Sequence, residues 1–574
     1  MNAPLPSSLS SSSHSDIWQS AQSLHAAGAY EAALDALDRM LDVSPADPGA
    51  LELAARLLAH RGRPGMPPML ATHSALADAH FALGAWLFER GRIGAAHRAY
   101  ERVLSLRPND ASALSNFGVV LMREARMGDA EAALSRALEI DPDHIGALLH
   151  QGLLNWRRGR LVQAEGAYRA ALARNATNAL AWNNLGLLLK DMNRLPESEA
   201  ACRRALSLNE NLAEAHNNLG NALWQLGRVE ESIDAYRRSL ALRPDYAAAR
   251  ANLALPLLCV GDYDAAWPLY ESRHDPAIGP EAIARPPVPY PQWQGESLVG
   301  KSVLVWPEQG LGDSLQFCRY VPMLKALGAA QVSLACAPTQ QRLFESLAGA
   351  DQVIPLNGQG RIERHDYWCL MMSLPLRFAT TVATIPARVP YLHAQAADVE
   401  TWQARLPAGA LKVGLVWAGN PRADQASSNA LDQRRSLDAQ SFAPLLGTQG
   451  VTFVSLQMGD STRPQIASLP AALRPFDPMD DVRDFADTAA IVANLDLVIT
   501  VDTSMAHLAG ALGRPVWVLS RYDACWRWFR DREDSPWYPS ARVFRQTQPD
   551  AWDDVLRRVE HALAALAASH EIQR

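Results

Sequence analysis

A 34-residue period runs through the first half of the chain and limits its fold more than any other feature. From about Ala77 onward, one phase of the period is small, as in Gly84, Gly118, Gly152, Gly186, Gly220 and Ala254. A second phase carries arginine, in Arg92, Arg126, Arg160, Arg194 and Arg228. A third is mostly aromatic, in Tyr100, Leu134, Tyr168, Cys202, Tyr236 and Tyr270. This spacing predicts stacked helix–turn–helix units, in which the small residue lets two helices approach and the aromatic residue fills the gap.

Proline positions strengthen this interpretation. Pro108, Pro142 and Pro244 recur where the second helix of a repeat would end, and proline cannot continue a helix. The 34-residue spacing with its small, aromatic and proline positions is identified as the tetratricopeptide signature. We therefore expect an α-solenoid, a superhelix of these repeats, over residues 77–274.

The region before residue 77 is less regular. Residues 17–76 predict one degenerate repeat and irregular cap helices, with a helix over 51–60 and a Gly/Pro-rich break over 61–68. Residues 1–16 are rich in serine and contain no basic stretch followed by an apolar core. They predict a disordered tail rather than a signal peptide.

One phase on the first helix of the repeats is rich in asparagine. Its members are Asn116, Asn184, Asn218 and Asn252. Side-chain amides can bind the backbone of a partner peptide whatever its sequence, so this phase predicts a partner-binding face. It resembles the asparagine ladder in the tetratricopeptide superhelix of O-linked N-acetylglucosamine transferases. The alternative is that these side chains satisfy neighbouring turns.

Composition narrows the classes of partner and compartment. The net charge of −7 gives no basic footprint, which argues against nucleic acid. The six cysteines show no paired spacing, as expected in a reducing compartment and not in a structural zinc site. No apolar run reaches the ~18 residues of a membrane span. We expect a cytoplasmic protein without a transmembrane segment.

The period fails after Ser272, and the composition changes. Residues 275–297 are rich in proline and predict a semi-rigid linker. Two series of alternating strands and helices then follow, over residues 298–400 and 401–574. We expect strands at 302–306, 331–335, 352–355, 367–372, 412–417, 451–456, 497–501, 516–519 and 543–544. The predicted fold class is α + α/β, a solenoid followed by two Rossmann-like lobes that face each other across a cleft.

The most informative stretch of the second series is residues 496–513, D-L-V-I-T-V-D-T-S-M-A-H-L-A-G-A-L-G. An apolar β-branched run ends at Asp502, and helical spacing begins after Ser504. Open α/β sheets bind ligands at such carboxyl ends, where a helix N-terminus favours phosphate. The alternative is that Asp502 only caps a structural helix.

The string D-T-S-M-A-H-L-A-G-A-L-G-R-P resembles the nucleotide-sugar-binding motif of the glycosyltransferase family that includes the lipopolysaccharide heptosyltransferases (family 9-like, GT-B fold). The resemblance covers about residues 301–567. It implies a donor site built from backbone N–H groups and short side chains. The residues at the matching positions are Asp502, Thr503, Ser504, Met505 and His507. His507 could equally be a packed core histidine, and we do not expect it to be catalytic.

A glycine-rich turn follows the first strand of the first series. E-Q-G-L-G-D-S-L, residues 308–315, does not fit the dinucleotide fingerprint G-x-G-x-x-G. It resembles the G-D-x-L turn of the same transferase family. The resemblance implies that Asp313 is the general base that deprotonates the acceptor hydroxyl in an inverting transfer. The alternative role of Asp313 is a helix cap.

Further donor contacts are implied by the resemblance. R-R-S-L, residues 434–437, is expected to open a helix, and Arg434 or Arg435 would contact the donor phosphates in place of the lysine usual in the family. An exposed arginine pair is the alternative. Gln457 lies where the family holds the nucleotide base and ribose. Residues 526–539, W-R-W-F-R-D-R-E-D-S-P-W-Y-P, alternate Trp and Arg, and the sequence assigns them no role.

The sequence contains no D-x-D after a strand and no other compact set of metal ligands. We therefore expect a metal-independent inverting glycosyltransferase with no cofactor beyond its nucleotide-diphosphate sugar, in which the repeats recruit a protein or glycan acceptor or another partner. The alternative is a non-catalytic tetratricopeptide scaffold with a silent transferase-like domain. A dehydrogenase has no supporting fingerprint.

Overall fold

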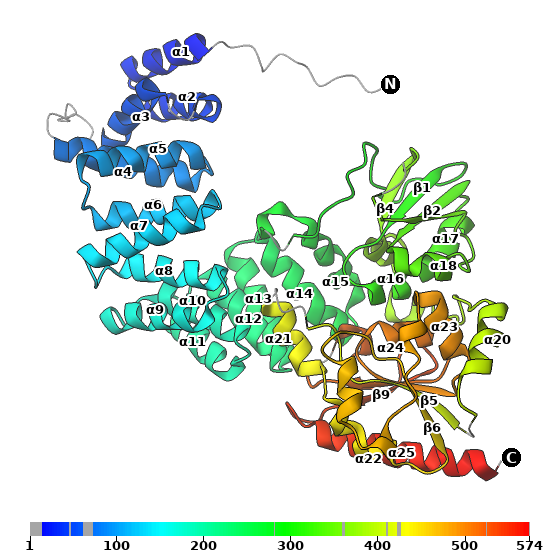
Figure 1. The fold of residues 1–574 in the computed structure, drawn as a ribbon. Helices are drawn as coiled ribbons and strands as arrows, with labels where there is room; N and C mark the ends of the chain where they lie inside the picture. Colours follow the sequence, from blue (N-terminus) through cyan, green and yellow to red (C-terminus); the bar gives the residue numbers. More distant parts are fainter. Residues whose placement is uncertain are drawn as a thin grey trace. The chain divides into compact units, whose positions relative to one another are not determined.

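The computed structural model describes residues 14–44, 47–60, 73–279, 282–358, 362–408, 411–421, 426–523 and 525–572. The predicted tail up to residue 13 and the break at 61–68 lie outside these ranges. The chain divides into two compact units, Met1–Leu189 and Lys190–Arg574 (Figure 1). The division falls inside the repeats, not at the point where they end.

The first unit consists of helices that stack in pairs (Figure 1). Each pair is one repeat, and its second helix ends two residues before the proline where one is present, as at Leu106 and Ile140. The predicted role of Pro108 and Pro142 is thus confirmed. The helices are α1 (His14–Ala26), α2 (Tyr30–Val43), α3 (Pro48–His60), α4 (His73–Glu89), α5 (Ile93–Leu106), α6 (Ala111–Arg123), α7 (Met127–Ile140), α8 (Ile145–Arg157), α9 (Leu161–Arg174) and, across the division, α10 (Ala179–Asp191).

The small phase of the repeat is a close-packing position, as expected. A Cβ added to Gly84 would lie 2.8 Å from Tyr100 Cζ, and one added to Gly152 would lie 2.4 Å from Tyr168 Cε1. Both distances are shorter than van der Waals contact. Any larger side chain would therefore push the two helices of a repeat apart.

A further phase of the repeat lies in the turn between the two helices. Its members all have the left-handed backbone conformation that glycine favours, although two of them are not glycine. They are Gly91 (φ 74°), Ala125 (61°), Gly159 (73°), Asn193 (58°), Gly227 (73°) and Gly261 (85°). Their spacing of 34 residues makes this turn as regular as the helices it joins.

The second unit begins with the last repeats and continues into two parallel sheets. The Pro-rich stretch between them is not a free connector. Trp293 is 1% exposed, and its backbone N–H donates to the Trp368 carbonyl at 2.7 Å, which fixes the stretch to the first sheet. The repeat helices are α11 (Leu195–Leu208), α12 (Ala213–Gln225), α13 (Val229–Leu242), α14 (Ala247–Val260) and α15 (Tyr263–Tyr270).

The first sheet has four parallel strands in the order β3-β2-β1-β4. The helical segment after β1 is interrupted at residues 318–320, and it resumes with Pro322 in its first turn, where proline is tolerated. The elements are β1 (Ser302–Trp306), α16 (Leu311–Phe317), α17 (Val321–Ala326), β2 (Gln331–Cys336), α18 (Gln341–Phe344), β3 (Gln352–Pro355), β4 (Tyr367–Leu370) and α19 (Leu374–Arg377).

The second sheet has five parallel strands in the order β6-β5-β7-β8-β9. Every residue of β7 is buried, as its apolar run predicts. The elements are α20 (Ala396–Arg405), β5 (Leu411–Val416), α21 (Ala426–Arg435), α22 (Ala443–Leu446), β6 (Val451–Ser455), α23 (Phe485–Ala493), β7 (Leu497–Val501), α24 (Ser504–Ala511), β8 (Val516–Ser520), β9 (Ala541–Arg545) and α25 (Trp552–Ile572).

Each sheet reverses its strand order at one place, which is where parallel sheets bind ligands. In the first sheet the chain leaves β1 for β2 on one side, and β4 pairs with β1 on the other. In the second sheet the same holds for β5, with β6 and β7 as its neighbours. The turn carrying Asp313 follows β1, and the turn carrying Asp502 follows β7. Both sequence motifs therefore lie at the expected crevices.

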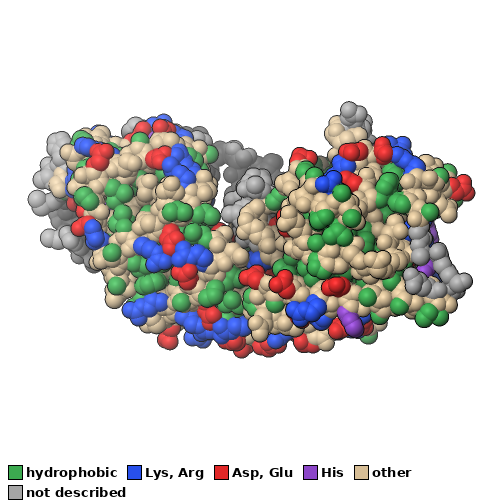
Figure 2. Space-filling model, turned by 60° about the horizontal axis from the view of Figure 1, so that its bottom comes forward, with side chains coloured by type: hydrophobic (Ala, Val, Ile, Leu, Met, Phe, Trp, Pro, Cys, Tyr) green, Lys and Arg blue, Asp and Glu red, His purple; other side chains and the backbone are tan. Residues whose placement is uncertain are grey.

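Surface composition agrees with the nearly balanced charge of the chain. On the face shown in Figure 2, acidic and basic side chains are interspersed, and neither sign dominates. Within the described ranges, no helix combines the length and apolar character needed to cross a bilayer.

Candidate functional site

The glycine-rich turn after β1 places Asp313 in the first turn of α16. The Asp313 carboxylate accepts a hydrogen bond from the backbone N–H of Gly310 at 2.8 Å, so it caps its own helix. A carboxylate is stabilised at this end of a helix by the helix dipole. Gln309, just before the cap, has a φ of +60°. Asp313 therefore has the capping role that was its alternative, and its second oxygen is left to contact other residues.

The turn after β7 assigns the helix cap to Thr503, not to Asp502. Thr503 Oγ1 accepts from the Met505 N–H at 3.3 Å. Asp502 instead accepts from the Trp528 indole N–H at 2.8 Å. Burial alone would raise the pKa of Asp502, but the charge of Arg521 and the indole hydrogen bond outweigh it and lower the pKa. Asp502 is thus held as a carboxylate.

The two turns are in direct contact. A Cβ added to Gly312 would lie 2.8 Å from His507 Cδ2 and 3.3 Å from Ser504 Cα, so only glycine lets α16 pack this closely on α24. The contact brings Asp313 of the first sheet beside Ser504 and His507 of the second. Met505, by contrast, is 7% exposed and faces the core, so only its backbone can contribute to a site.

The segment around residues 526–538, to which the sequence assigned no role, connects the two turns. Arg527 forms an ion pair with Asp313, and its Nε donates to Gln316 Oε1 at 2.8 Å. The next residue, Trp528, holds Asp502, and Tyr538 hydrogen-bonds His507 Nδ1 at 3.0 Å. In the sequence, the alternation of tryptophan and arginine is the signal that marks this connecting segment.

His507 is a packed histidine, in agreement with its more conservative interpretation. Its ring stacks on Trp528 with 5.5 Å between centroids and 17° between planes. Burial, and secondarily the charge of Arg527, lower the pKa of His507 to about 3. The imidazole is therefore neutral at physiological pH.

The two arginines expected at the donor phosphates lie at the end of α21, so the prediction that they open a helix is wrong. Arg434 donates to Asn193 Oδ1 at 2.8 Å and pairs with Asp523 at 3.2 Å. Arg435 pairs with Asp432 at 2.8 Å and donates to the Asp502 carbonyl at 3.1 Å. Arg435 therefore reaches the second turn, while Arg434 is tied to a repeat.

Gln457 shapes the carboxyl ends of two neighbouring strands, β5 and β6. It is 1% exposed, and its Oε1 accepts from the N–H groups of Trp417 and Ala418, both at 3.0 Å. Its Nε2 donates to the carbonyls of Ala418 and Met458. These bonds direct the Gln457 side chain at the protein itself.

The last repeat fixes the position of the glycine-rich turn. Arg273, directly after α15, donates to both oxygens of Glu308 at 2.8 Å in a buried bidentate pair. The Met372 N–H donates to the same carboxylate at 2.9 Å. Tyr270 of α15 accepts from Gln309 Nε2 at 2.7 Å. The repeats thus contribute directly to the geometry around Asp313.

The asparagine phase has partners inside the repeats. In the first unit, Asn116 donates to Tyr100 OH at 3.3 Å, and Asn184 accepts from its neighbour Asn183 at 3.5 Å. In the second unit, Asn252 donates to Asn217 Oδ1 of the preceding repeat at 3.0 Å. Asn218 is 7% exposed. All three partners lie in helices, not in neighbouring turns, and three of the four asparagines remain partly exposed.

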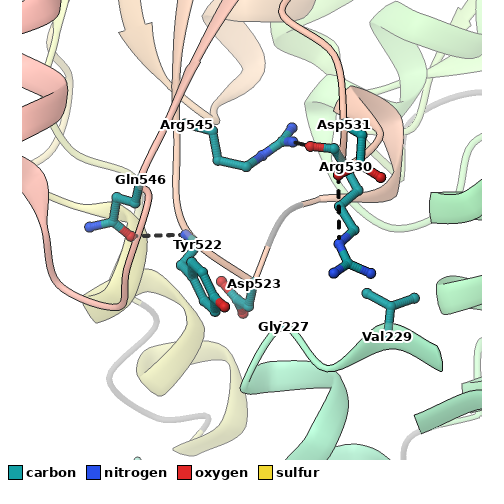
Figure 3. Close-up of a pocket in the computed structure, with 8 residues that line it drawn as sticks. All are labelled: Gly227, Val229, Tyr522, Asp523, Arg530, Asp531, Arg545 and Gln546. Atoms are coloured by element: carbon teal, nitrogen blue, oxygen red, sulfur yellow. Dashed lines mark hydrogen bonds and ion pairs between the residues drawn. The ribbon is translucent and has the colours of Figure 1, made fainter. Parts of the chain in front are cut away.

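A cavity of about 160 Å³ lies between the α12–α13 turn and the loops of the second sheet (Figure 3). Arg545 donates to the Arg530 carbonyl at its edge, and Gln546 accepts from the Tyr522 N–H at 2.9 Å. The residues that line the cavity are Gly227, Val229, Tyr522, Asp523, Arg530, Asp531, Arg545 and Gln546. In the described part of the chain, no three His, Cys, Asp or Glu side chains gather as metal ligands would.

Comparison with known proteins identifies the repeats. A family model described as the cilia and flagella-associated protein 70 middle TPR-like domain matches residues 88–209, and a tetratricopeptide repeat model matches residues 184–247 and 217–277. Protein FlbA of Caulobacter vibrioides is 32% identical over 335 residues. That match covers 54% of this chain and 54% of FlbA, so the chain spans about half the length of this relative.

Solved structures similar to this chain include a tetratricopeptide repeat protein. A thermophilic TPR protein of Thermus thermophilus is 23% identical and covers 32% of this chain and 99% of its own, with a TM-score of 0.30. The pilF protein of Pseudomonas aeruginosa is 19% identical and covers 36% of this chain and 94% of its own, with a TM-score of 0.32. The family models, together with the 34-residue helix pairs, identify residues 88–277 as tetratricopeptide repeats.

Proposed function

We propose that the two sheets form an inverting glycosyltransferase of the GT-B type that uses a nucleotide-diphosphate sugar. One observation carries the proposal. The turns at the reversal points of both sheets meet where Gly312 packs on α24. The Asp313 carboxylate of the first sheet therefore lies near the N-terminus of α24 in the second sheet, the end of a helix that favours phosphate. The sequence motifs in these turns, which resemble those of the heptosyltransferase-containing family, support the same assignment.

The chemistry follows from the positions of the groups. The acceptor hydroxyl oxygen attacks the anomeric carbon while the Asp313 carboxylate accepts its proton. The bond from that carbon to the phosphate oxygen breaks, and the diphosphate leaves with the electron pair. Arginine side chains, among them Arg435, and the N-terminus of α24 would compensate the negative charge of the leaving group, as a metal ion does in other transferases. No cofactor is needed beyond the co-substrate.

The repeats would bring a protein or glycan acceptor to the site. Their support for this role is general, because tetratricopeptide repeats form extended binding surfaces. The partly exposed amides of Asn116, Asn184 and Asn252 are the groups we assign to a partner backbone. We place the protein in the cytoplasm because all six of its cysteines are free thiols.

A non-catalytic scaffold is the second candidate function, and a specific observation favours it. Both carboxylates of the site are occupied by protein partners, Asp313 by Arg527 and Asp502 by Trp528. In this case the sheets would serve as a silent domain and the repeats would supply the function.

Calorimetric titration of the full chain with UDP, ADP, GDP and their sugars separates the two. The transferase proposal expects one nucleotide to bind in the micromolar to millimolar range, with turnover lost in Asp313→Asn while binding is retained. A folded protein that binds none of them at millimolar concentration would refute the transferase and leave the scaffold.

A further inference from the structure

We infer that Arg527 binds the diphosphate of the donor and that, without donor, the same guanidinium is held by Asp313. This inference rests on the proposed function. It means that donor binding transfers Arg527 from a protein carboxylate to a phosphate and thereby releases the base. Arg527 would then make the availability of Asp313 depend on the presence of donor.

The surroundings of Arg527 are those of a binding residue rather than of a surface charge. Its side chain is 11% exposed, and the guanidinium lies 4.4 Å from the centroid of the Trp526 ring. Burial would lower the pKa of Arg527, but the adjacent Asp313 carboxylate outweighs it and raises the pKa. The group is therefore a permanent cation whose charge is compensated by one carboxylate.

A second group beside Arg527 also calls for an acceptor. Gln316 is fully buried, and its Oε1 accepts from Arg527 Nε at 2.8 Å. Its Nε2 is buried too and donates to no acceptor within the described ranges. An unsatisfied buried donor is costly, so it is rarely retained without a role. A phosphate oxygen at Arg527 would satisfy it.

The position of Arg527 suits a phosphate better than the positions of the two arginines of α21. Arg434 and Arg435 each have a carboxylate partner that is not part of the reaction, Asp523 and Asp432. The partner of Arg527 is Asp313, which follows Gly312, the residue in contact with Ser504 at the start of α24. Arg527 thus pairs with the proposed base and lies close enough to α24 for its charge to lower the pKa of His507.

The backbone around Arg527 is held in a conformation that few side chains adopt. Phe529 has φ +53° and ψ −168°, a region almost confined to glycine, so the surrounding packing must hold it there. The Phe529 ring stacks on Tyr263 of the last repeat, at 6.1 Å and 18°. Packing against the repeat therefore maintains the turn that presents Arg527.

Pairing with Arg527 and proton acceptance by Asp313 exclude each other. In the pair, one Asp313 oxygen contacts the guanidinium and the other accepts from the Gly310 N–H. A hydroxyl that approaches this carboxylate must compete with a charge-assisted bond. By linkage, a change at Asp313 that weakens the pair strengthens phosphate binding at Arg527 by at most the same factor.

The test is calorimetric titration of full-length protein with UDP, ADP and GDP, with the matching nucleosides as reference ligands. Arg527→Met should weaken binding of the diphosphate by about 10-fold or more and leave the nucleoside within about two-fold. Asp313→Asn should tighten diphosphate binding by about 5-fold or more, because Arg527 is then free. A purely structural Arg527 gives no tightening.

Arg530→Met is the matched control, since Arg530 lies three residues away and pairs with the exposed Glu230. It should bind the diphosphate like the wild type. If Arg527→Met fails to fold, as judged by circular dichroism, Arg527→Lys and Asp313→Asn decide the matter.

Wild-type protein that binds a diphosphate while Arg527→Met binds it equally well overturns this inference alone. The same holds if Asp313→Asn does not tighten binding. Wild-type protein that binds no nucleotide overturns the proposed function and this inference together.

Discussion

The turn between the two helices of a repeat has the same backbone in both units but different surroundings. In the first unit, a Cβ added to Gly91 or Gly159 meets no described atom within 4 Å. In the second unit, a Cβ added to Gly227 would lie 2.5 Å from Tyr522 Cε1, and one added to Gly261 would lie 3.2 Å from Val382 Cγ2. The backbone of the turn is therefore preserved along the repeats while the packing around it changes.

The difference extends to charged and aromatic contacts. In the second unit, Glu230 pairs with Arg530, and Tyr263 accepts from the Trp537 indole N–H at 3.1 Å. Arg273, at the end of the repeats, reaches the turn that carries Asp313 through Glu308. The repeats of the second unit thus form part of the wall of the candidate site.

The largest loss of stability should come from breaking the buried ion pair of Arg273 with Glu308 in the second unit. Arg273→Met leaves buried Glu308 without its bidentate guanidinium partner, and we expect a loss of about 3–5 kcal/mol in the free energy of unfolding. Arg126→Met removes an exposed pair with Asp129 in the first unit and should cost about 0.2–0.5 kcal/mol. Urea unfolding followed by circular dichroism measures both. Equal losses in the two variants would contradict the expected difference between the buried and the exposed ion pair.

The turn glycines allow a matched test. Gly91→Ala should cost about 1–2 kcal/mol, the penalty for a Cβ in the left-handed region. Gly227→Ala adds the approach to Tyr522, which we expect to cost about 1–3 kcal/mol more. Thermal unfolding gives the two values. Adding Tyr522→Ala to Gly227→Ala should recover most of the additional loss in stability. If it does not, the clash with Tyr522 is not the cause of that loss.

The first unit should respond to acid through His150. Burial lowers the pKa of His150 to about 4, and His150 Nδ1 lies 2.8 Å from Ser115 Oγ. Because protonation favours the unfolded chain, stability is complete above about pH 6.5 and falls as the pH decreases toward about 4, by on the order of 2 kcal/mol. His150 lies in the same phase of the repeat as Asn116 and Asn184. His150→Asn should therefore fit this position and flatten the dependence of Tm on pH in that window. An unchanged slope would exclude His150 as its source.

The smallest effect should come from the exposed pair that joins a repeat to the second sheet. Glu230 and Arg530 have exposed side-chain fractions of 70% and 37%, so we expect a coupling energy below about 1 kcal/mol. A double-mutant cycle of Glu230→Ala and Arg530→Ala measures it. The coupling should vanish in about 1 M salt, and a larger, salt-independent value would show that this contact is desolvated.

The sequence predicted what depends on local pattern. The repeat helices follow from the 34-residue period, and strands such as Ser302–Trp306 and Leu497–Val501 match because a β-branched run buried on both faces has few other solutions. Asp313 and Asp502 were placed correctly at the carboxyl ends of β1 and β7 for the same reason. Contact between their turns depends on Gly312, whose role only the packing of α16 on α24 reveals.

The sequence could not predict what depends on distant partners. The ion pair of Arg527 with Asp313 joins residues 214 positions apart. Arg434 and Arg435 were predicted to open a helix, but they lie in the last turn of α21, where basic residues are favoured. Gln457 and Asp502 were expected to contact a ligand, but their hydrogen bonds to Trp417 and Trp528 could not be inferred from spacing.

The regular turn phase has a consequence for how the chain can change in length. Loss or gain of one whole repeat in the first unit would shorten or extend the stack and leave its other contacts in register. In the second unit, each turn position faces a different residue. Asn193 accepts from Arg434, Gly227 faces Tyr522, and Gly261 faces Val382. Removing one whole repeat there would present the wrong turn to each of them. The number of repeats in the second unit is therefore fixed, while the number in the first unit is free to vary.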